Sequence, residues 1–274
     1  TPMPVANASC PARSLAYAGR TPPFDMHVLG MPDLHPFNAE LLQIEPPKTW
    51  SLIATVFGDL DGDGLSGKQI GALLGNVGIK PEASRVALHR LRHDGWIVSH
   101  KFGREVNYTL SDRGRTETVA AQKDVYRRDV KFADGWQVFA LHPDHAGHPT
   151  EGVLLGGNLV LLPKGARIDD ALTLSLGDGP LPAWVEACLV PTHLLKQAAA
   201  LGELAERVDP LQEQLTSAHA TTTRLLFIHY WRKMALRIGV WAHIGLLPQG
   251  DMARCHRAVT TVLSKTPKII PPEV

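Results

Sequence analysis

Residues 79–96 have the sequence IKPEASRVALHRLRHDGW, which predicts a helix with a defined start and stop. Pro81 suits the first helical turn, where a backbone N–H is not needed, and Glu82 complements the positive end of the helix dipole. Gly95 supplies the usual C-terminal stop. Lys80 occupies the position at which Ser, Thr or Asp would cap more strongly, so the start of the helix is imperfect.

The predicted helix has an apolar side and a charged side. At about 100° per residue, one side gathers Ala83, Val86, Ala87, Leu88 and Leu91. The opposite side gathers Glu82, Arg85, His89 and Arg92, with Ser84 and Arg90 at the borders. A cationic stripe on an isolated short helix is usually only a solvated surface, so the neighbouring segments decide how the stripe is interpreted.

The segments on both sides of this helix predict a winged helix-turn-helix. Residues 66–78 indicate another helix, with apolar side chains at a three-four spacing, and residues 78–80 leave a short turn between the two helices. Residues 96–110 predict a hairpin of two strands. Its tip carries Lys101 and Arg104. Two helices, a short turn and a basic-tipped hairpin are far more specific together than any one of them alone.

Several blocks of the sequence resemble the PaaX family of bacterial transcriptional repressors. The blocks are residues 50–53, 57–59, 85–91, 94–96 and 224–232. The likeness extends over roughly residues 46–250 and is weaker in the middle. It implies a repressor of an aromatic-acid, phenylacetate-type catabolic operon that releases DNA when an aryl-acyl-coenzyme A such as phenylacetyl-coenzyme A binds. It also implies a ferredoxin-like fold for the middle region.

The expected DNA contacts follow from the predicted winged helix. A homodimer would present two recognition helices to successive major grooves of double-stranded DNA, so the operator should be roughly palindromic, with half-sites ~10 bp or a multiple apart. Arg85 and His89 are the candidates for base edges. The other candidate DNA contacts are Lys80, Ser84, Arg92, Lys101 and Arg104. An apolar stripe on the helix predicted at residues 192–208 is a second reason to expect a dimer.

The composition bounds the class of protein. The chain has 274 residues, enough for two or three domains, and a formal net charge of +1, so a DNA-binding surface must concentrate its positive charge locally. Three widely spaced cysteines match no metal pattern and favour reduced thiols in a cytoplasmic protein. We expect no membrane contact, because no apolar run approaches the ~20 residues of a membrane helix and no signal-peptide pattern is apparent.

The pattern along the chain predicts an α+β protein in four parts. Residues 1–45 are rich in Pro, Ala and Gly and indicate a flexible extension. Residues 46–115 form the predicted winged helix-turn-helix domain. Residues 116–191 predict a linker helix and a small α+β middle domain. Residues 192–274 predict a helical C-terminal domain. The strands expected in the middle domain are residues 134–141, 156–163 and 187–190.

Two local patterns offer metal-ligand residue types without completing a site. Residues 59–64 copy the opening of an EF-hand calcium loop, yet Ile70 stands at the twelfth position, where a bidentate Glu is required. A polar turn brings together residues of ligand type without a second ligand set, namely His142, Asp144, His145 and His148. We expect no metal, no cofactor and, because no local catalytic motif is apparent, no catalytic residues and no enzyme activity.

His229 and Arg232 are the tentative effector-binding residues. Core packing with a satisfied polar tip is the commoner role of a residue such as His229, whereas the alternative places both cations around an anionic coenzyme A ligand. Two other classes of function stay open, a winged-helix module that binds protein and an enzyme with a non-local active site. Salt dependence separates DNA binding, which weakens steeply as salt rises, from an apolar protein interface.

Overall fold

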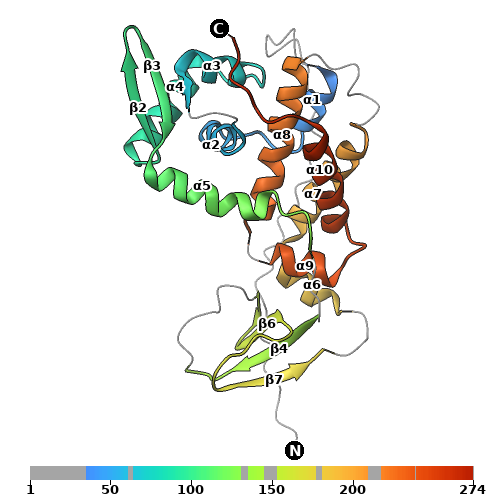
Figure 1. Ribbon diagram of the computed structural model, residues 1–274. Coiled ribbons are helices and arrows are strands. Elements are labelled where there is room, and N and C mark those ends of the chain that lie inside the picture. The colour runs from blue at the N-terminus through green and yellow to red at the C-terminus, as the bar shows by residue number, and fades with distance from the viewer. Residues whose placement is uncertain are drawn as a thin grey trace, which may run out of the picture.

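The computed structural model describes residues 35–60, 64–130, 135–144, 153–176, 181–208, 217–237 and 239–273. In this part of the chain the protein is mixed α/β, with ten helices and two antiparallel sheets (Figure 1). One sheet belongs to the N-terminal part and the other to the middle of the sequence. Long helices from the C-terminal half lie between them.

The N-terminal unit, residues 49–110, combines three helices with a three-stranded sheet in the order β1-β3-β2. The predicted helix-turn-helix segment and hairpin are confirmed as secondary structure, and Gly95 ends α4 with a positive φ of 69°. The elements of the unit are α2 (Thr49–Asp59), β1 (Gly64–Ser66), α3 (Gly67–Gly75), α4 (Pro81–His93), β2 (Ile97–Phe102) and β3 (Glu105–Leu110).

The start of α3 follows from its cap. The Ser66 hydroxyl accepts from the Gln69 backbone N–H, and the Gln69 side chain accepts in return from the Ser66 N–H. This capping box satisfies two N–H groups that the helix leaves unpaired. No strand was predicted at residues 64–66. They form β1, which pairs with β3 through Leu65 and Tyr108.

The burial of α4 and α2 corrects part of the predicted apolar pattern. Ala87, Leu88 and Leu91 are buried as expected. Val86, however, is 69% exposed, and Ser84, predicted at the border, is only 4% exposed. The sequence also predicts a helix from near Pro47 with Trp50 on its buried side, but Trp50 is 40% exposed. The predicted apolar side of α4 was too wide, because the helix buries a narrower stripe than its apolar residues suggest.

The hairpin of β2 and β3 projects from the N-terminal unit (Figure 1). Its strands pair in register up to Phe102 opposite Glu105, which leaves Gly103 and Arg104 as a two-residue turn. Gly103 has a φ of 59°, the conformation that tight hairpin turns require and that glycine adopts without strain. Lys101 and Arg104 therefore lie at the exposed tip, as predicted.

The middle of the chain forms a four-stranded sheet at the end of the molecule opposite the hairpin (Figure 1). Its order is β5-β6-β4-β7. The predicted ferredoxin-like arrangement is not confirmed, because residues 164–170 between its last two strands contain turns and no helix. Residues 187–190, predicted as a strand, belong largely to a helix. The elements are β4 (Trp136–Leu141), β5 (Val153–Gly156), β6 (Leu159–Pro163), β7 (Ala171–Ser175) and α6 (Ala183–Leu189).

Helix α8 (Ser217–Ala235) is the centre of the molecule and is buried on most sides. It packs against α2 of the N-terminal unit and against α5 (Asp112–Val125), which runs from the hairpin towards α8 (Figure 1). Its fully buried side chains include Phe227 and Trp231. The remaining C-terminal helices are α7 (Thr192–Glu206), α9 (Val240–Leu246) and α10 (Asp251–Lys265).

One further expectation is wrong, and one of the reasons for expecting a dimer does not hold. The predicted flexible extension includes a helix, α1 (Pro36–Leu42), whose Phe37 and Leu41 are buried against the core; residues 1–34 lie outside the described residues. The apolar stripe of α7, which suggested a dimer, packs on α10 within the same chain. Gly202 allows this close approach, because an added Cβ would lie 3.3 Å from Cys255 Cα.

No helix in the described part of the chain is long and apolar enough to cross a membrane. Among those same residues, no group of three or more His, Cys, Asp or Glu side chains is arranged to hold a metal ion. His142 and Asp144 lie in a turn, whereas His145 and His148 fall outside the described residues.

Candidate nucleic-acid interface

Helix α4 and the hairpin of the N-terminal unit both carry exposed basic side chains. We call this set of side chains the cationic face. The side chain of Arg85 is 76% exposed and that of Arg90 is 67% exposed. Its members are Lys80, Arg85, His89, Arg90, Arg92 and His93 from α4 and its cap, together with His100, Lys101 and Arg104 from the hairpin.

The ion pairs on the cationic face are long and open to water. Arg85 lies 3.8 Å from Glu82, and Arg90 lies 3.6 Å from Asp94. Exposed pairs of this kind contribute ~0–1 kcal/mol, so they do not hold these side chains in place. The arginines can exchange their partners for a ligand anion at little cost.

Helix α4 is held to its own unit by the opposite side. Leu88 and Leu91 are 4% and 7% exposed. At its C-terminal end, the Ser111 hydroxyl donates to the Gly95 carbonyl at 2.7 Å, and the Gly114 N–H donates to the Ser111 Oγ at 3.0 Å. An added Cβ at Gly114 would lie 2.1 Å from the Trp96 carbonyl oxygen, so only glycine fits there. These contacts join α4, β2 and the start of α5.

The structure exposes all predicted DNA-contact residues except one. Lys80, Arg85, His89, Arg92, Lys101 and Arg104 are all exposed. Ser84 is the exception, because it is buried and its hydroxyl lies 3.4 Å from the Lys80 carbonyl oxygen within the helix. Its prediction as a surface contact is wrong.

Two exposed apolar residues on this surface were missed by the sequence reasoning. Val86 lies on α4 between the exposed cations, and Phe102, 68% exposed, lies beside the hairpin turn. Val86 was predicted on the apolar side of its helix, and Phe102 was predicted at the hairpin tip without a role in binding. The exposure of Val86 could have been predicted, because Ala87, Leu88 and Leu91 alone already form a narrow buried stripe on the helix.

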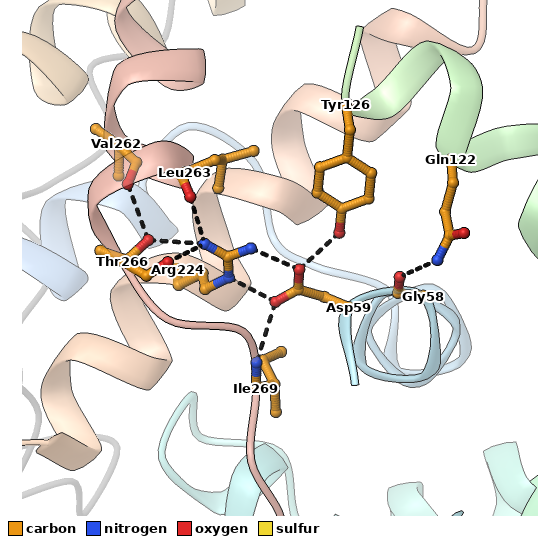
Figure 2. Close-up of polar contacts among 9 residues, drawn as sticks. All are labelled: Gly58, Asp59, Gln122, Tyr126, Arg224, Val262, Leu263, Thr266 and Ile269. Carbon is orange, nitrogen blue, oxygen red and sulfur yellow. Dashed lines mark hydrogen bonds and ion pairs between the residues drawn. The ribbon is translucent and has the colours of Figure 1, made fainter. Parts of the chain in front are cut away.

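A buried ion pair joins the N-terminal unit to α8 (Figure 2). Asp59, at the end of α2, accepts from Arg224 Nε at 2.6 Å and from Nη2 at 2.7 Å. The two side chains are 0% and 4% exposed. Asp59 was the first residue of the calcium-loop pattern, and its oxygens are fully used here. We call this group of contacts the junction.

Every remaining polar group of the junction has a partner as well (Figure 2). Asp59 also accepts from the Tyr126 hydroxyl at 2.7 Å and from the Ile269 N–H at 3.2 Å. Arg224 Nη1 donates to the Leu263 and Thr266 carbonyls at 2.8 and 2.7 Å. Burial and the neighbouring Asp59 charge raise the pKa of Tyr126, so it remains a donor. The junction therefore connects α2, α5, α8 and the chain after α10.

The two tentative effector residues have different surroundings. His229 is 1% exposed, its Nδ1 lies 3.5 Å from Thr55 Oγ1, and burial lowers its pKa to about 4. It is therefore a neutral core residue and is closed to a ligand. Arg232 lies one turn further along α8 and lines a cavity of about 230 Å³ between α2, α5 and α8.

Comparison with known proteins gives results that agree with this geometry. Residues 48–114 match the family model of PaaX-like proteins. The chain carries a PaaX-like domain. This domain coincides with the N-terminal unit and the start of α5. The chain is also similar to the transcriptional repressor PaaX of Escherichia coli (strain K12), at 27% identity over an alignment of 247 residues that covers 76% of this chain and 77% of that protein.

The similarity to the Escherichia coli repressor extends well beyond the PaaX-like domain. Inside the domain lies the block of residues 57–59 that carried the family resemblance, and outside it lies the block of residues 224–232. The junction brings these two blocks together through Asp59 and Arg224. The resemblance thus includes both the cationic face and the contact that holds its unit to the rest of the chain.

Proposed function

We propose that this protein is a DNA-binding transcriptional repressor whose residues 46–115 act as a winged helix-turn-helix domain. The observation that carries the proposal is the cationic face, on which α4 and the hairpin expose cations without strong partners. The similarity to a transcriptional repressor supports the same function. A protein with a net charge of only +1 gains DNA affinity by concentrating positive charge in this way.

In this proposal α4 lies in the major groove as the recognition helix. Arg85 and His89 reach the base edges, since an arginine pairs well with the O6 and N7 of guanine. Val86, exposed between them and the other cations, suits the methyl group of thymine. The wing residues Lys101 and Arg104, together with Lys80 and Arg92, contact phosphates and fix the position of the domain without reading sequence.

We also propose a homodimer on a roughly palindromic operator, with half-sites ~10 bp or a multiple apart. Its support is the symmetry of helix-turn-helix recognition and not the stripe of α7, which is covered within the chain. The further domain boundaries, 116–191 with a ferredoxin-like fold and 192–274, belong to the same proposal. So does control of a phenylacetate-type operon by an aryl-acyl-coenzyme A effector, which rests on the family resemblance.

A second candidate function is a winged-helix module that binds a protein partner. The exposed Val86 and Phe102 favour it, because both would suit an apolar interface. The two candidates differ in their response to salt. A DNA complex loses affinity steeply as salt rises through counterion release, whereas an apolar interface is nearly insensitive.

The test begins with selection of genomic fragments by the purified full chain. Fragments that are retained are then titrated with the protein from 50 to 200 mM salt. The proposal predicts that a shared, roughly palindromic sequence is enriched and that its affinity falls by about 10³ or more over this range if six or more phosphates are contacted. Retention of no DNA at 50 mM salt would contradict it.

A further inference from the structure

The cavity beside Arg232 lies where the N-terminal unit meets the rest of the chain. Its walls come from α2, α5 and α8, and from Trp96, the residue between α4 and β2. The lining is mixed, with apolar side chains such as Ala54, Val125 and Ile228 beside polar ones such as Thr118 and Gln122. Trp96 also stacks edge-on against Phe57 of the core, with 6.3 Å between ring centroids. The cavity therefore contacts the elements that position the cationic face.

Arg232 is the cation of this cavity, and its guanidinium makes no hydrogen bond or ion pair with any residue in the described part of the chain. It is partly buried, and this burial lowers its pKa. Arg224, two turns earlier on the same helix, shows how the fold treats a buried guanidinium that has a structural role, with a carboxylate and carbonyl oxygens around it. Arg232 lacks all such partners.

The carboxylate in the lining does not neutralise Arg232. Glu117 lines the same cavity, but it accepts from Arg113 Nε at 2.7 Å on the exposed side of α5. A partly desolvated cation that has no partner is costly, whereas a carboxylate brought by a ligand would pair with it in a bidentate manner. The chemistry of the cavity thus favours an anion with an apolar body.

The size of the cavity limits the size of the apolar part of the ligand. An apolar cavity of about 150 Å³ holds benzene, so about 230 Å³ accommodates a six-membered ring and a carboxylate. Pockets for drug-sized ligands are larger, at ~300–1,000 Å³. A whole acyl-coenzyme A, with its pantetheine arm and nucleotide, exceeds this space. A ligand held within the cavity is consequently a different species from the effector proposed above.

We propose that the cavity binds a small apolar monocarboxylate, about the size of benzoate, whose carboxylate pairs with Arg232 and whose apolar part contacts Trp96 and the helices around it. The ligand bridges α8 and α5 and touches the connection between α4 and β2. Binding is a property of the free protein. Its consequence for DNA, a change in affinity through Trp96 and α2, rests on the proposed function.

The test is calorimetry of the full chain, without DNA, using benzoate and its neutral analogue benzamide. Benzoate should bind, and benzamide should bind roughly tenfold or more weakly, because it cannot form the charge-assisted pair. Arg232→Met should weaken benzoate to the same degree. Arg237→Met, which removes an exposed arginine just after α8, is the matched control and should bind benzoate as the wild type does.

Thermal unfolding separates a ligand role from a structural role. If Arg232 serves a ligand, Arg232→Met without ligand should melt at the same temperature as wild type or higher. Benzoate should raise the melting temperature of the wild type and of Arg237→Met, but not that of Arg232→Met. Equal affinity of the wild type for benzoate and benzamide, no benzoate binding at millimolar concentration, or equal benzoate binding by Arg232→Met would overturn the proposal.

The effect on DNA is measured separately, by titrating retained DNA with and without saturating benzoate. A changed dissociation constant in wild type and in Arg237→Met, but not in Arg232→Met, supports the coupling. An unchanged constant in the wild type overturns the coupling and leaves the site. Failure of the protein to bind any DNA contradicts the proposed function and leaves the calorimetric result as it stands.

Discussion

Helices α4 and α8 place the same residue type in opposite surroundings. On α4, Arg85 is exposed and 3.8 Å from its nearest carboxylate. On α8, Arg224 is buried and makes two short bonds to Asp59 together with bonds to backbone carbonyls. The difference shows that arginines in this chain have different roles, which depend on whether the side chain is exposed or buried. Exposure without a partner suits recognition of an anion, whereas burial with every donor satisfied suits assembly of the fold.

The comparison also explains why two distant blocks of sequence act together. The cationic face needs a rigid support, and α2 provides it through buried residues and through Asp59 at its end. Arg224, 165 residues later, completes that end. A change at the junction should therefore affect folding, while a change on the cationic face should affect binding and leave the fold intact.

Asp59→Asn tests the junction and should have the largest effect on stability. It leaves the Arg224 charge buried without its carboxylate, which should lower the free energy of unfolding by about 3–5 kcal/mol. Urea denaturation followed by circular dichroism measures it. The control is Glu117→Gln, which breaks the exposed pair with Arg113 and should cost less than about 1 kcal/mol. Equal effects of the two changes would remove the distinction between junction and surface.

Leu91→Ala, compared with Val86→Ala, tests which side of α4 packs against its own unit. Leu91 is 7% exposed, so its truncation should cost about 2–5 kcal/mol of stability. Val86→Ala, on the exposed side, should change stability by less than about 0.5 kcal/mol. The same urea titrations measure both. If Val86→Ala proved the more destabilising, α4 would pack with a face different from the one described.

His229 gives the core near the junction a pH dependence. Burial lowers its pKa from the usual 6.5 to about 4, so the unfolded chain binds a proton that the folded chain excludes. Its contribution to stability is present above pH 6.5 and is lost as the pH falls towards 4. Between pH 7 and pH 5 the free energy of unfolding should drop by about 2 kcal/mol from this residue.

His229→Gln should reduce that drop, as measured by urea denaturation at both pH values. The buried His243 and His256, whose pKa values are also lowered by burial, would leave a residual slope of the same sign. A slope in the variant as steep as in the wild type would mean that His229 is protonated in the folded protein.

Arg104→Ala should have a smaller effect on stability than Asp59→Asn, Leu91→Ala or His229→Gln. The side chain lies in the exposed hairpin turn, where it makes no contact that the fold needs. In the proposed complex it neutralises one phosphate. Its loss should weaken specific and scrambled DNA alike and reduce the slope of log affinity against log salt by about one unit. Fluorescence anisotropy at several salt concentrations measures both quantities.

The sequence predicted best where local signals determine the structure. Helix α4 has Pro81 at its start and Gly95 at its end, and the hairpin has a glycine in its turn, so both could be located from a few residues. Residues 187–190 were predicted wrongly as a strand, because a short apolar run fits a strand and a buried helix equally well. Helix α1 was missed because its apolar residues are few and are buried against α8, which lies far away in the sequence.

The candidate site was predicted only in part for the same reason. Exposed residues follow from local spacing on a helix or a hairpin, and all predicted DNA-contact residues except Ser84 are exposed. Contacts between distant segments give no local signal, so neither the pair of Asp59 and Arg224 nor the cavity at Arg232 was foreseen. The charge of Asp59 instead suggested a calcium loop, because its partner stands far away in the sequence.

The most direct test of the account is the binding of Arg85→Ala to a selected operator and to a scrambled sequence, measured by fluorescence anisotropy at one salt concentration. Arg254→Ala is the matched control, since Arg254 is an arginine on α10 that pairs with Glu206 away from the cationic face. The account predicts that Arg85→Ala loses about 1–3 kcal/mol of operator affinity and much of its discrimination, while Arg254→Ala binds as wild type does. A folded Arg85→Ala protein that binds the operator as tightly and selectively as the wild type would contradict the assignment of α4 as the recognition helix.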